Sequence, residues 1–112
     1  MKVPNADKAV VTESKIKDYL LSYTHERGRH KAAFLALFGF NVDNWQELDN
    51  RLKGHIRAYD FTSTTENRFG TRYTVEGEID TPSGRWVRIR TVWFIDKNEE
   101  TPRFVSAYPR SL

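Results

Sequence analysis

The sequence of 112 residues contains no cysteine, which excludes disulfide bonds, thiol nucleophiles and thiolate metal ligands. It has no apolar run near the roughly 20 residues that a membrane-spanning helix needs, and its start lacks the apolar segment of a signal peptide. We therefore expect no membrane association, and the absence of cysteine suits a reducing cytoplasm. The chain also lacks a Gly-rich phosphate loop, a calcium loop and an H-E-x-x-H motif, so we expect neither a metal site nor a cofactor.

The composition is that of one folded domain. Hydrophobic residues make up 38% of the chain and aromatic residues 13%, which is enough for a single core but not, at this length, for two. The net charge is only +3, because 18 basic residues are mixed with 15 acidic ones. A surface for nucleic acid must therefore come from local clusters of basic residues, and such clusters occur at Arg27–Lys31 and Arg85–Arg90.

Helical periodicity dominates the first half of the chain. Residues 1–8 are polar and contain a proline, so we expect a flexible arm, and the apolar residues 9–11 indicate a short edge strand. Apolar side chains then recur at helical spacing and predict a first helix over residues 13–23: Ile16, Tyr19, Leu20 and Tyr23.

Two further helices are predicted. The second begins near Gly28–His30 and ends at Gly39. Because it is apolar nearly all round, we expect it to be buried in the centre of the domain. The third should span residues 45–58, where Asn44 and Glu47 have the spacing of a capping box.

After Asp60 the pattern changes to the alternation typical of strands. We predict strands at residues 72–79, 85–96 and 103–108, joined in an antiparallel meander. The turn at residues 81–84, T-P-S-G, has proline at the second position and glycine at the fourth, as in a type I turn with a glycine bulge.

This turn fixes the register of the hairpin. If Thr81 pairs with Arg85, one face pairs Ile79 with Val87, Gly77 with Ile89, Val75 with Thr91 and Tyr73 with Trp93. The opposite face then pairs Glu78 with Arg88 and Glu76 with Arg90. A slip of one residue would separate both pairs of opposite charge, so the register is well specified.

Together these segments predict an α+β fold in a single domain of residues 1–112. The N-terminal helices, residues 13–58, should pack on one face of the C-terminal antiparallel β-meander of residues 60–110. The sequence shows no internal repeat and no linker that would divide it.

Eight short segments carry a resemblance to a known family. They are P-N-A-D-K-A-V-V (4–11), K-I-K-D-Y-L-L (15–21), H-E-R-G-R-H-K-A-A-F (25–34), G-F (39–40), R-Y-T-V-E-G (72–77), T-P-S-G-R (81–85), R-T-V-W (90–93) and P-R-F-V-S-A-Y-P (102–109). At these residues, over nearly its whole length, the chain resembles a family of small bacterial domains of uncharacterised function. That family looks like a branch of the barnase–EndoU–colicin–RelE-like group of nucleases and toxins.

The resemblance implies metal-independent RNA cleavage. In this chemistry the ribose 2′-hydroxyl attacks the adjacent phosphate, an acid protonates the leaving oxygen, and cations stabilise the charge on the phosphate. Some members of the group are toxins of toxin–antitoxin or conflict systems, so the partners that the resemblance implies are RNA and a small neutralising protein. The function is implied by analogy of fold.

The segment His25–Lys31 offers the best catalytic candidates. His25 is the acid/base candidate because histidine titrates near neutral pH, although it could instead cap the end of the first helix. Lys31 is the candidate cation for the phosphate, and its alternative is a surface lysine whose stem covers apolar neighbours. His30 points about 100° away from Lys31 on a helix, so both are not expected at one site.

The strands add Arg90, Thr91 and Tyr108 to the catalytic candidates. Arg90 would bind the phosphate, unless its cross-strand pair with Glu76 holds it. Thr91 lies on the face of the strand opposite to Arg90 and is a candidate for assisting the catalytic groups. Tyr108 could donate its hydroxyl to a phosphate, with packing in the core as the alternative.

Further basic residues are candidates for binding nucleic acid: Lys15, Arg27, Arg29, His30 and Arg88. The alternative to an enzyme is a non-catalytic module that binds a protein partner or nucleic acid through the same basic surface. An antitoxin or immunity protein fits less well, because a basic toxin calls for an acidic partner. The positions of these side chains distinguish the enzyme from the non-catalytic module. An enzyme needs His25, Lys31 and a strand arginine within reach of one phosphate, whereas a binding module can spread them.

Overall fold

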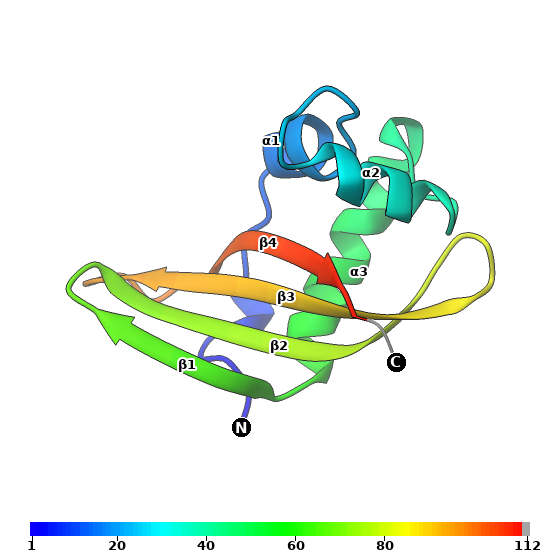
Figure 1. Cartoon of the computed structure of the whole chain (residues 1–112). Helices are drawn as coiled ribbons and strands as arrows, with labels where there is room; N and C mark the ends of the chain where they lie inside the picture. The colour runs from blue at the N-terminus through cyan, green and yellow to red at the C-terminus, as the bar shows by residue number, and fades with distance from the viewer. Residues whose placement is uncertain (111–112) are drawn as a thin grey trace.

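The computed structural model of the protein describes residues 1–110, and it is an α+β fold, as predicted (Figure 1). The helical half contains η1 (Ala6–Lys8), α1 (Glu13–Lys15), η2 (Ile16–Leu20), α2 (Arg29–Ala36), η3 (Val42–Asn44) and α3 (Trp45–Ala58). The second half contains β1 (Phe61–Asn67), β2 (Gly70–Asp80), β3 (Trp86–Asp96) and β4 (Arg103–Pro109). The four strands form one antiparallel sheet in the order β1-β2-β3-β4.

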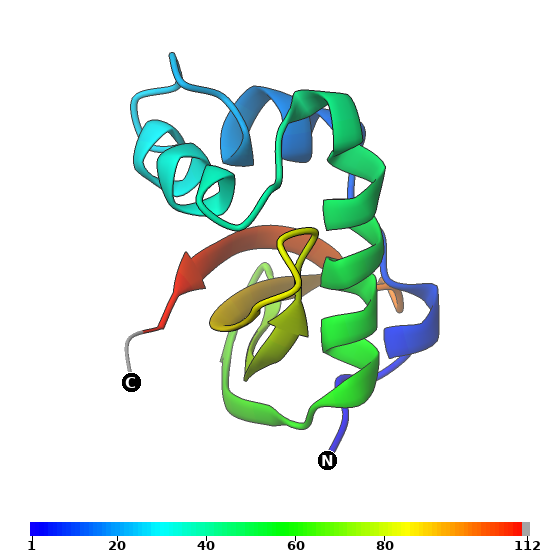
Figure 2. The same cartoon turned by 90° about the vertical axis from the view of Figure 1, so that its right-hand side faces the viewer.

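The helix α3 is the central helix of the fold, and it begins and ends where the sequence predicts. Its buried residues, Leu48, Leu52, His55 and Ile56, recur at helical spacing and face the sheet. Figure 2 shows α3 lying along one face of the sheet, while α1, η2 and α2 lie over the β4 edge. No helix of residues 1–110 has the length and apolar character needed to cross a membrane.

The β2–β3 hairpin has the predicted register. The structure pairs Tyr73 with Trp93, Val75 with Thr91, Gly77 with Ile89 and Ile79 with Val87, together with Glu76–Arg90 and Glu78–Arg88. The turn closes through the amide of Gly84, which donates to the carbonyl of Thr81 at 2.9 Å. Gly84 has a φ of +84°, a conformation that favours glycine. Turn chemistry therefore sets the pairing of the two longest strands.

The strand β1 was not predicted. Its sequence, F-T-S-T-T-E-N, is exposed along six of its seven positions, so it shows no apolar alternation. It is an edge strand that pairs only with β2, with an irregularity between Phe61 and Ser63. The signal that could have indicated it is the run of threonines, which favour strands.

The predicted central burial of the second helix is wrong. In α2 only Ala32 and Leu35 are buried, and Leu37, just after it, is 75% exposed. The helix has eight residues and packs against η2 and the end of β4. An apolar composition all round a short helix did not distinguish a helix at the rim from one in the core.

The N-terminal segment packs against the domain, in contrast to the expected arm. Val3 and Ala6 are buried, and the amide of Phe61 donates to the carbonyl of Met1. The expected strand at residues 9–11 is a single parallel bridge between Val10 and Arg103.

Two helix ends also differ from the predictions. The first helical segment ends at Leu20 rather than residue 23, because the amide of Leu21 bonds back to Ile16 in a wide turn. The capping box lies at Asn41 and Asn44, whose side chains exchange hydrogen bonds with each other's backbone amides. It therefore caps η3 and not α3.

Candidate active site

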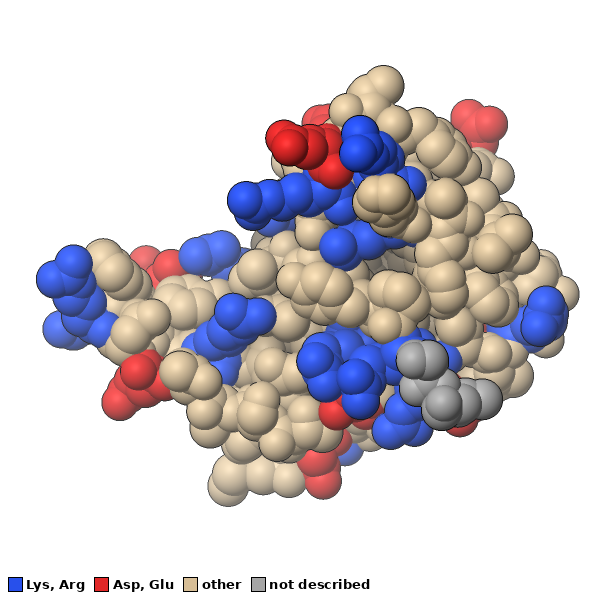
Figure 3. All heavy atoms as spheres, viewed as in Figure 1, with Lys and Arg blue, Asp and Glu red and all other residues tan. Residues whose placement is uncertain are grey.

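An open cleft of about 620 Å³ lies between the first helical turns and the edge strand β4. Its lining is mostly polar and includes two cations, Lys15 and Arg27. The full set is Thr12, Ser14, Lys15, Asp18, Tyr19, His25, Arg27, Val105, Ser106 and Tyr108. We call it the β4 cleft. Figure 3 shows Lys and Arg side chains gathered below α1 and over β3 and β4, on the face that contains this cleft. Only one residue of the lining, Asp18, is acidic.

Tyr19 is the residue around which the cleft is arranged. Its hydroxyl is 2.8 Å from the hydroxyl of Ser106 on β4, which ties η2 to the edge strand. The amine of Lys15 lies 5.1 Å from the ring centroid and that of Lys31 lies 5.6 Å from it. The ring of His25 meets the Tyr19 ring edge-on, with 5.0 Å between centroids. Residues from three separate segments therefore converge on one phenol.

Lys15 is held at the floor of the cleft. Its amine donates to the carbonyl of Val105 on β4 at 3.2 Å. Its backbone amide donates to the hydroxyl of Thr12, which caps α1. The helix start and the edge strand together fix the position of this cation.

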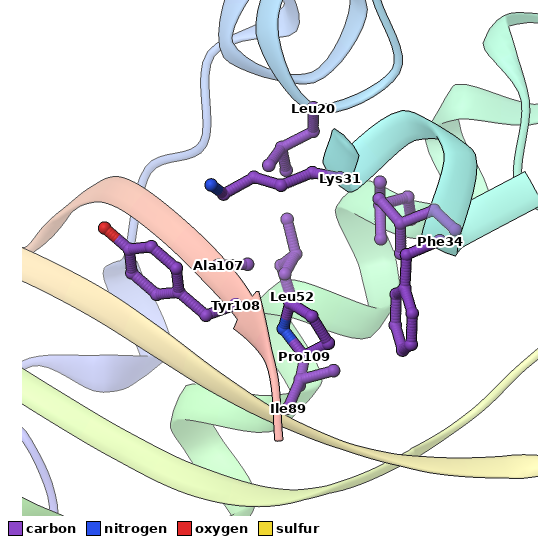
Figure 4. Close-up of a pocket in the computed structure, with 10 residues that line it drawn as sticks. Leu20, Lys31, Phe34, Leu52, Ile89, Ala107, Tyr108 and Pro109 are labelled. Atoms are coloured by element: carbon purple, nitrogen blue, oxygen red, sulfur yellow. The ribbon is translucent and has the colours of Figure 1, made fainter. Parts of the chain in front are cut away.

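Lys31 projects from α2 with its stem over an apolar cavity of about 20 Å³ (Figure 4). The cavity is lined by Leu20, Phe34, Leu52 and Ile89, among others. The amine extends past these side chains and lies 4.5 Å from the centroid of the Tyr108 ring. Among residues 1–110, no carboxylate forms an ion pair with it. The packed stem thus positions an amine whose charge is not neutralised.

His25 uses one of its ring nitrogens to build the loop before α2. Its Nδ1 accepts hydrogen bonds from the amides of Arg27 and Gly28, each at 3.0 Å. A nitrogen that accepts two bonds carries no proton, so the proton of the neutral ring is on Nε2. The polar group that His25 can offer to a ligand in this arrangement is the Nε2–H donor.

Gly28 lets this loop come close to η2. A Cβ atom at Gly28 would lie 1.8 Å from the carbonyl oxygen of Tyr19, so only glycine fits. The H-E-R-G-R-H-K segment therefore places His25 and Lys31 on the same phenol because its glycine allows the backbone to touch the preceding helical turn.

Arg90 lies outside the cleft, on the open face of the sheet. Its Nη2 donates to Glu76 at 3.2 Å, which is the cross-strand pair that the sequence gives as the alternative to a catalytic role. The same carboxylate oxygen is 2.7 Å from Nε of Arg110. The sheet register places Arg90 directly beside Tyr108, which lines the cleft. The structure thus brings the strand arginine next to the cleft but not onto Tyr19. Of the three groups whose convergence is expected of an enzyme, His25 and Lys31 meet at Tyr19 and Arg90 does not.

Thr91 faces the core, away from the cleft. It is fully buried beneath α3, and its hydroxyl lies 2.9 Å from Nδ1 of His55 and 2.8 Å from the indole Nε1 of Trp93. His55 also donates from Nε2 to the carbonyl of Gly77. Burial lowers the pKa of His55 to about 4. Thr91 and His55 therefore form a structural network, and we leave Thr91 out of the proposed site.

The remaining basic candidates are divided among three places. Lys15 and Arg27 line the cleft. Arg29 and His30 are exposed at the start of α2, and Arg88 is exposed on the sheet. The sequence analysis missed Tyr19 and Ser106 as site residues. Tyr19 falls on the apolar helical pattern, and no local signal links it to a serine 87 positions away.

Metal ligands do not gather at this site. Within residues 1–110, no three His, Asp or Glu side chains form a group that could hold a metal ion. The groups that the cleft presents are the amine of Lys15, a guanidinium, an imidazole, hydroxyls and the carboxylate of Asp18, and the amine of Lys31 lies beside it near Tyr108. Such groups bind and stabilise anions by charge and hydrogen bonding.

The fold and the cleft define a class: a small α+β domain whose antiparallel meander has a polar cleft with basic side chains at its edge strand. The chain belongs to the family described as Domain of unknown function (DUF6883), whose model matches residues 2–111. A comparison with curated proteins found no match.

Among solved structures, the fold is similar to a chain of the contact-dependent growth inhibition toxin–immunity protein complex from Klebsiella pneumoniae 342. The TM-score is 0.72 with 16% sequence identity, and the match covers 90% of this chain and 99% of that chain. The expected link to a family of uncharacterised domains is confirmed. The place of that family among nucleases stays a proposal, because a likeness at this identity shows the fold alone.

Proposed function

We propose that this protein is a toxin-like domain that cleaves RNA in the β4 cleft. The observation that carries the proposal is the convergence of Lys15, His25 and Lys31 on Tyr19, beside Tyr108. These residues come from α1, the loop before α2, α2 itself and β4. A surface that binds a partner through spread charges has no need to focus two amines and an imidazole on one ring.

The proposed reaction is attack of the ribose 2′-hydroxyl on the adjacent phosphate. A bond forms between the 2′-oxygen and phosphorus while the bond from phosphorus to the 5′-oxygen breaks. One proton leaves the 2′-hydroxyl and one joins the 5′-oxygen, so the products are a 2′,3′-cyclic phosphate and a 5′-hydroxyl. Negative charge on the phosphate grows in the transition state, and this is the charge that fixed cations stabilise.

Three residues of the cleft, together with Lys31 from the neighbouring cavity, have roles in this proposal. Lys31 and Lys15 supply the positive charge at the phosphate. His25 donates from Nε2, and it can exchange protons there only when Nδ1 gives up the amides of Arg27 and Gly28. Tyr108 offers its hydroxyl, since it is 39% exposed and lies under the amine of Lys31.

The test is cleavage of total cellular RNA by purified protein in EDTA. We expect discrete products from wild type and a loss of about 100-fold or more in rate for Lys31→Met, which keeps the stem and removes the charge. Lys8→Met is the matched control, because Lys8 is exposed on η1 beside α3, away from the cleft. Equal rates for Lys31→Met and Lys8→Met would exclude the cleft as the active site.

The same experiment addresses a non-catalytic module. If wild type gives no products in EDTA but binds a 2′-O-methyl RNA, and Lys31→Met weakens that binding, the cleft binds nucleic acid without cleaving it. If neither cleavage nor RNA binding occurs, the proposed function is excluded and a protein partner is the alternative left to test.

A further inference from the structure

A row of charged and aromatic side chains crosses the open face of the sheet and ends at the β4 cleft. The register aligns Glu76 on β2, Arg90 on β3 and Tyr108 on β4. This face is opposite α3, since the neighbouring positions Val75 and Thr91 are buried on the α3 side. Tyr108 is shared between the row and the cleft.

Two arginines of this face share one carboxylate. Oε1 of Glu76 is 3.2 Å from Nη2 of Arg90 and 2.7 Å from Nε of Arg110. One negative charge cannot neutralise two guanidiniums, so the pair keeps an excess positive charge. Among the described residues, the buried Nε of Arg90 has no hydrogen-bond partner.

The carboxylate also holds the two guanidiniums in place. Glu76 is only 15% exposed at its side chain, whereas Arg90 and Arg110 are 38% and 42% exposed. The backbone amide of Arg110 donates to the carbonyl of Arg88, which fixes the chain after β4. The result is a pair of accessible guanidiniums near Tyr108. Arg90 belongs to the neighbouring strand, about 5 Å across the sheet, and Arg110 follows Tyr108 by two residues.

We propose that Arg90 and Arg110 form a second phosphate-binding position, beside the phosphate that Lys31 and Lys15 hold in the β4 cleft. The ligand is then a single strand of nucleic acid that contacts the protein through at least two neighbouring phosphates. This inference rests on the proposed function for the first position. It assigns Arg90 to binding of the strand and adds Arg110, which no sequence pattern had singled out.

The test measures how affinity depends on the number of phosphates. The probes are 2′-O-methyl uridine oligomers, which lack the attacking hydroxyl, in competition with a fluorescein-labelled 2′-O-methyl hexauridine followed by anisotropy. For wild type we expect a step in affinity of about tenfold between the dinucleotide, with one phosphodiester, and the trinucleotide, with two.

The variants Arg90→Gln and Arg110→Gln should reduce this step and leave dinucleotide binding unchanged. Each should also lower the slope of log affinity against log salt by about 0.7 for the longer oligomer. Arg90→Gln breaks the cross-strand pair with Glu76 and could therefore disturb folding. Arg110→Gln keeps that pair, so it tests the same position in a protein whose sheet is intact. The matched control is Arg57→Gln on α3, which removes the same charge from the helical side.

The outcomes separate this inference from the proposed function. A length step that disappears in both arginine variants supports the second position even if wild type never cleaves RNA. A step that is unchanged in both variants, or that falls equally in Arg57→Gln, overturns it even if the cleft proves catalytic.

Discussion

At the scale of single residues, His25 illustrates how one side chain can serve structure and ligand at once. Its Nδ1 accepts two amides of the loop, and its other nitrogen is free for a ligand. The variants His25→Asn and His25→Ala separate these roles, because the asparagine Oδ1 occupies the place of Nδ1 and can accept the same amides.

We expect both variants to lose at least tenfold in RNA cleavage, since both lack Nε2. His25→Ala should also lose about 1 kcal/mol of unfolding free energy, as helix caps do, while His25→Asn stays near wild type. Urea unfolding and cleavage rates measure the two effects. An active His25→Asn would reduce His25 to a purely structural role.

The buried residues form a second network of hydrogen bonds. Trp93 Nε1 donates to the hydroxyl of Thr91, which can donate to Nδ1 of His55, and His55 donates from Nε2 to Gly77. Every donor in this chain has an acceptor, but an added proton on His55 would face the Thr91 hydroxyl in a buried position. Burial of the ring away from water disfavours the charged form and lowers the pKa of His55 to about 4.

This depression predicts a pH dependence of stability. The unfolded state takes up a proton near pH 6.5 and the folded state only near 4, so stability is fully present above pH 6.5 and is lost as pH falls through about 4. The difference corresponds to about 3 kcal/mol. Urea unfolding from pH 7.5 to 4 should show this loss in wild type, and a much flatter profile in His55→Gln.

His55→Gln also shows how much of the pH dependence of stability comes from carboxyl groups. A hydrogen bond from Arg103 lowers the pKa of Asp96, and one from the amino terminus lowers that of Asp60, and both carboxyls remain in His55→Gln. Parallel profiles for wild type and variant would show that His55 is not the group responsible.

At the scale of elements, the contact between η2 and the loop before α2 decides the shape of the cleft. Gly28→Ala would bring a methyl group onto the Tyr19 carbonyl, so we expect a loss of about 1–3 kcal/mol in unfolding free energy and a large loss of cleavage. Gly54→Ala is the matched control in α3, where a Cβ meets no atom within 4 Å.

Gly54→Ala should therefore gain about 0.5–1 kcal/mol, because alanine is the better helix former. Thermal or urea unfolding should therefore show a lower unfolding free energy than wild type for Gly28→Ala and a higher one for Gly54→Ala. A Gly28→Ala protein as stable and active as wild type would show that the close approach at Tyr19 is not required.

The β2–β3 hairpin and α3 could be predicted because local rules specify them. The T-P-S-G turn and the Glu76–Arg90 and Glu78–Arg88 pairs point to one register, and the apolar face of α3 has a clear helical period. The strand β1 and the placement of α2 could not be predicted in this way. Their positions depend on which neighbours cover them, and their own sequences lack a period that distinguishes core from edge.

The site could be predicted in part for the same reason. His25 and Lys31 lie in one short segment of unusual composition, so the sequence alone draws attention to them. Tyr19 and Ser106 meet only through the packing of η2 on β4. Arg110 is recognised as a candidate only in the structure, where it shares the carboxylate of Glu76 with Arg90.

At the scale of the whole molecule, the two faces of the sheet differ, and this difference is what would let a chain with a net charge of +3 bind nucleic acid as we propose. The helix α3 covers one face and buries the core, so the open face and the β4 edge are available for charge (Figures 1 and 3). On this side Lys15, Lys31, Arg90 and Arg110 lie within a few strand widths of Tyr108. An acidic protein that covers this side would neutralise the proposed activity.

The most direct test of the central claim compares an RNA oligonucleotide with its 2′-O-methyl analogue in EDTA, with product ends identified by mass. We predict that wild type cleaves only the RNA and leaves a 2′,3′-cyclic phosphate and a 5′-hydroxyl, and that Lys31→Met cleaves it about 100-fold or more slowly. Cleavage of the 2′-O-methyl strand, a requirement for added divalent metal, or no cleavage of RNA by the folded protein would contradict it.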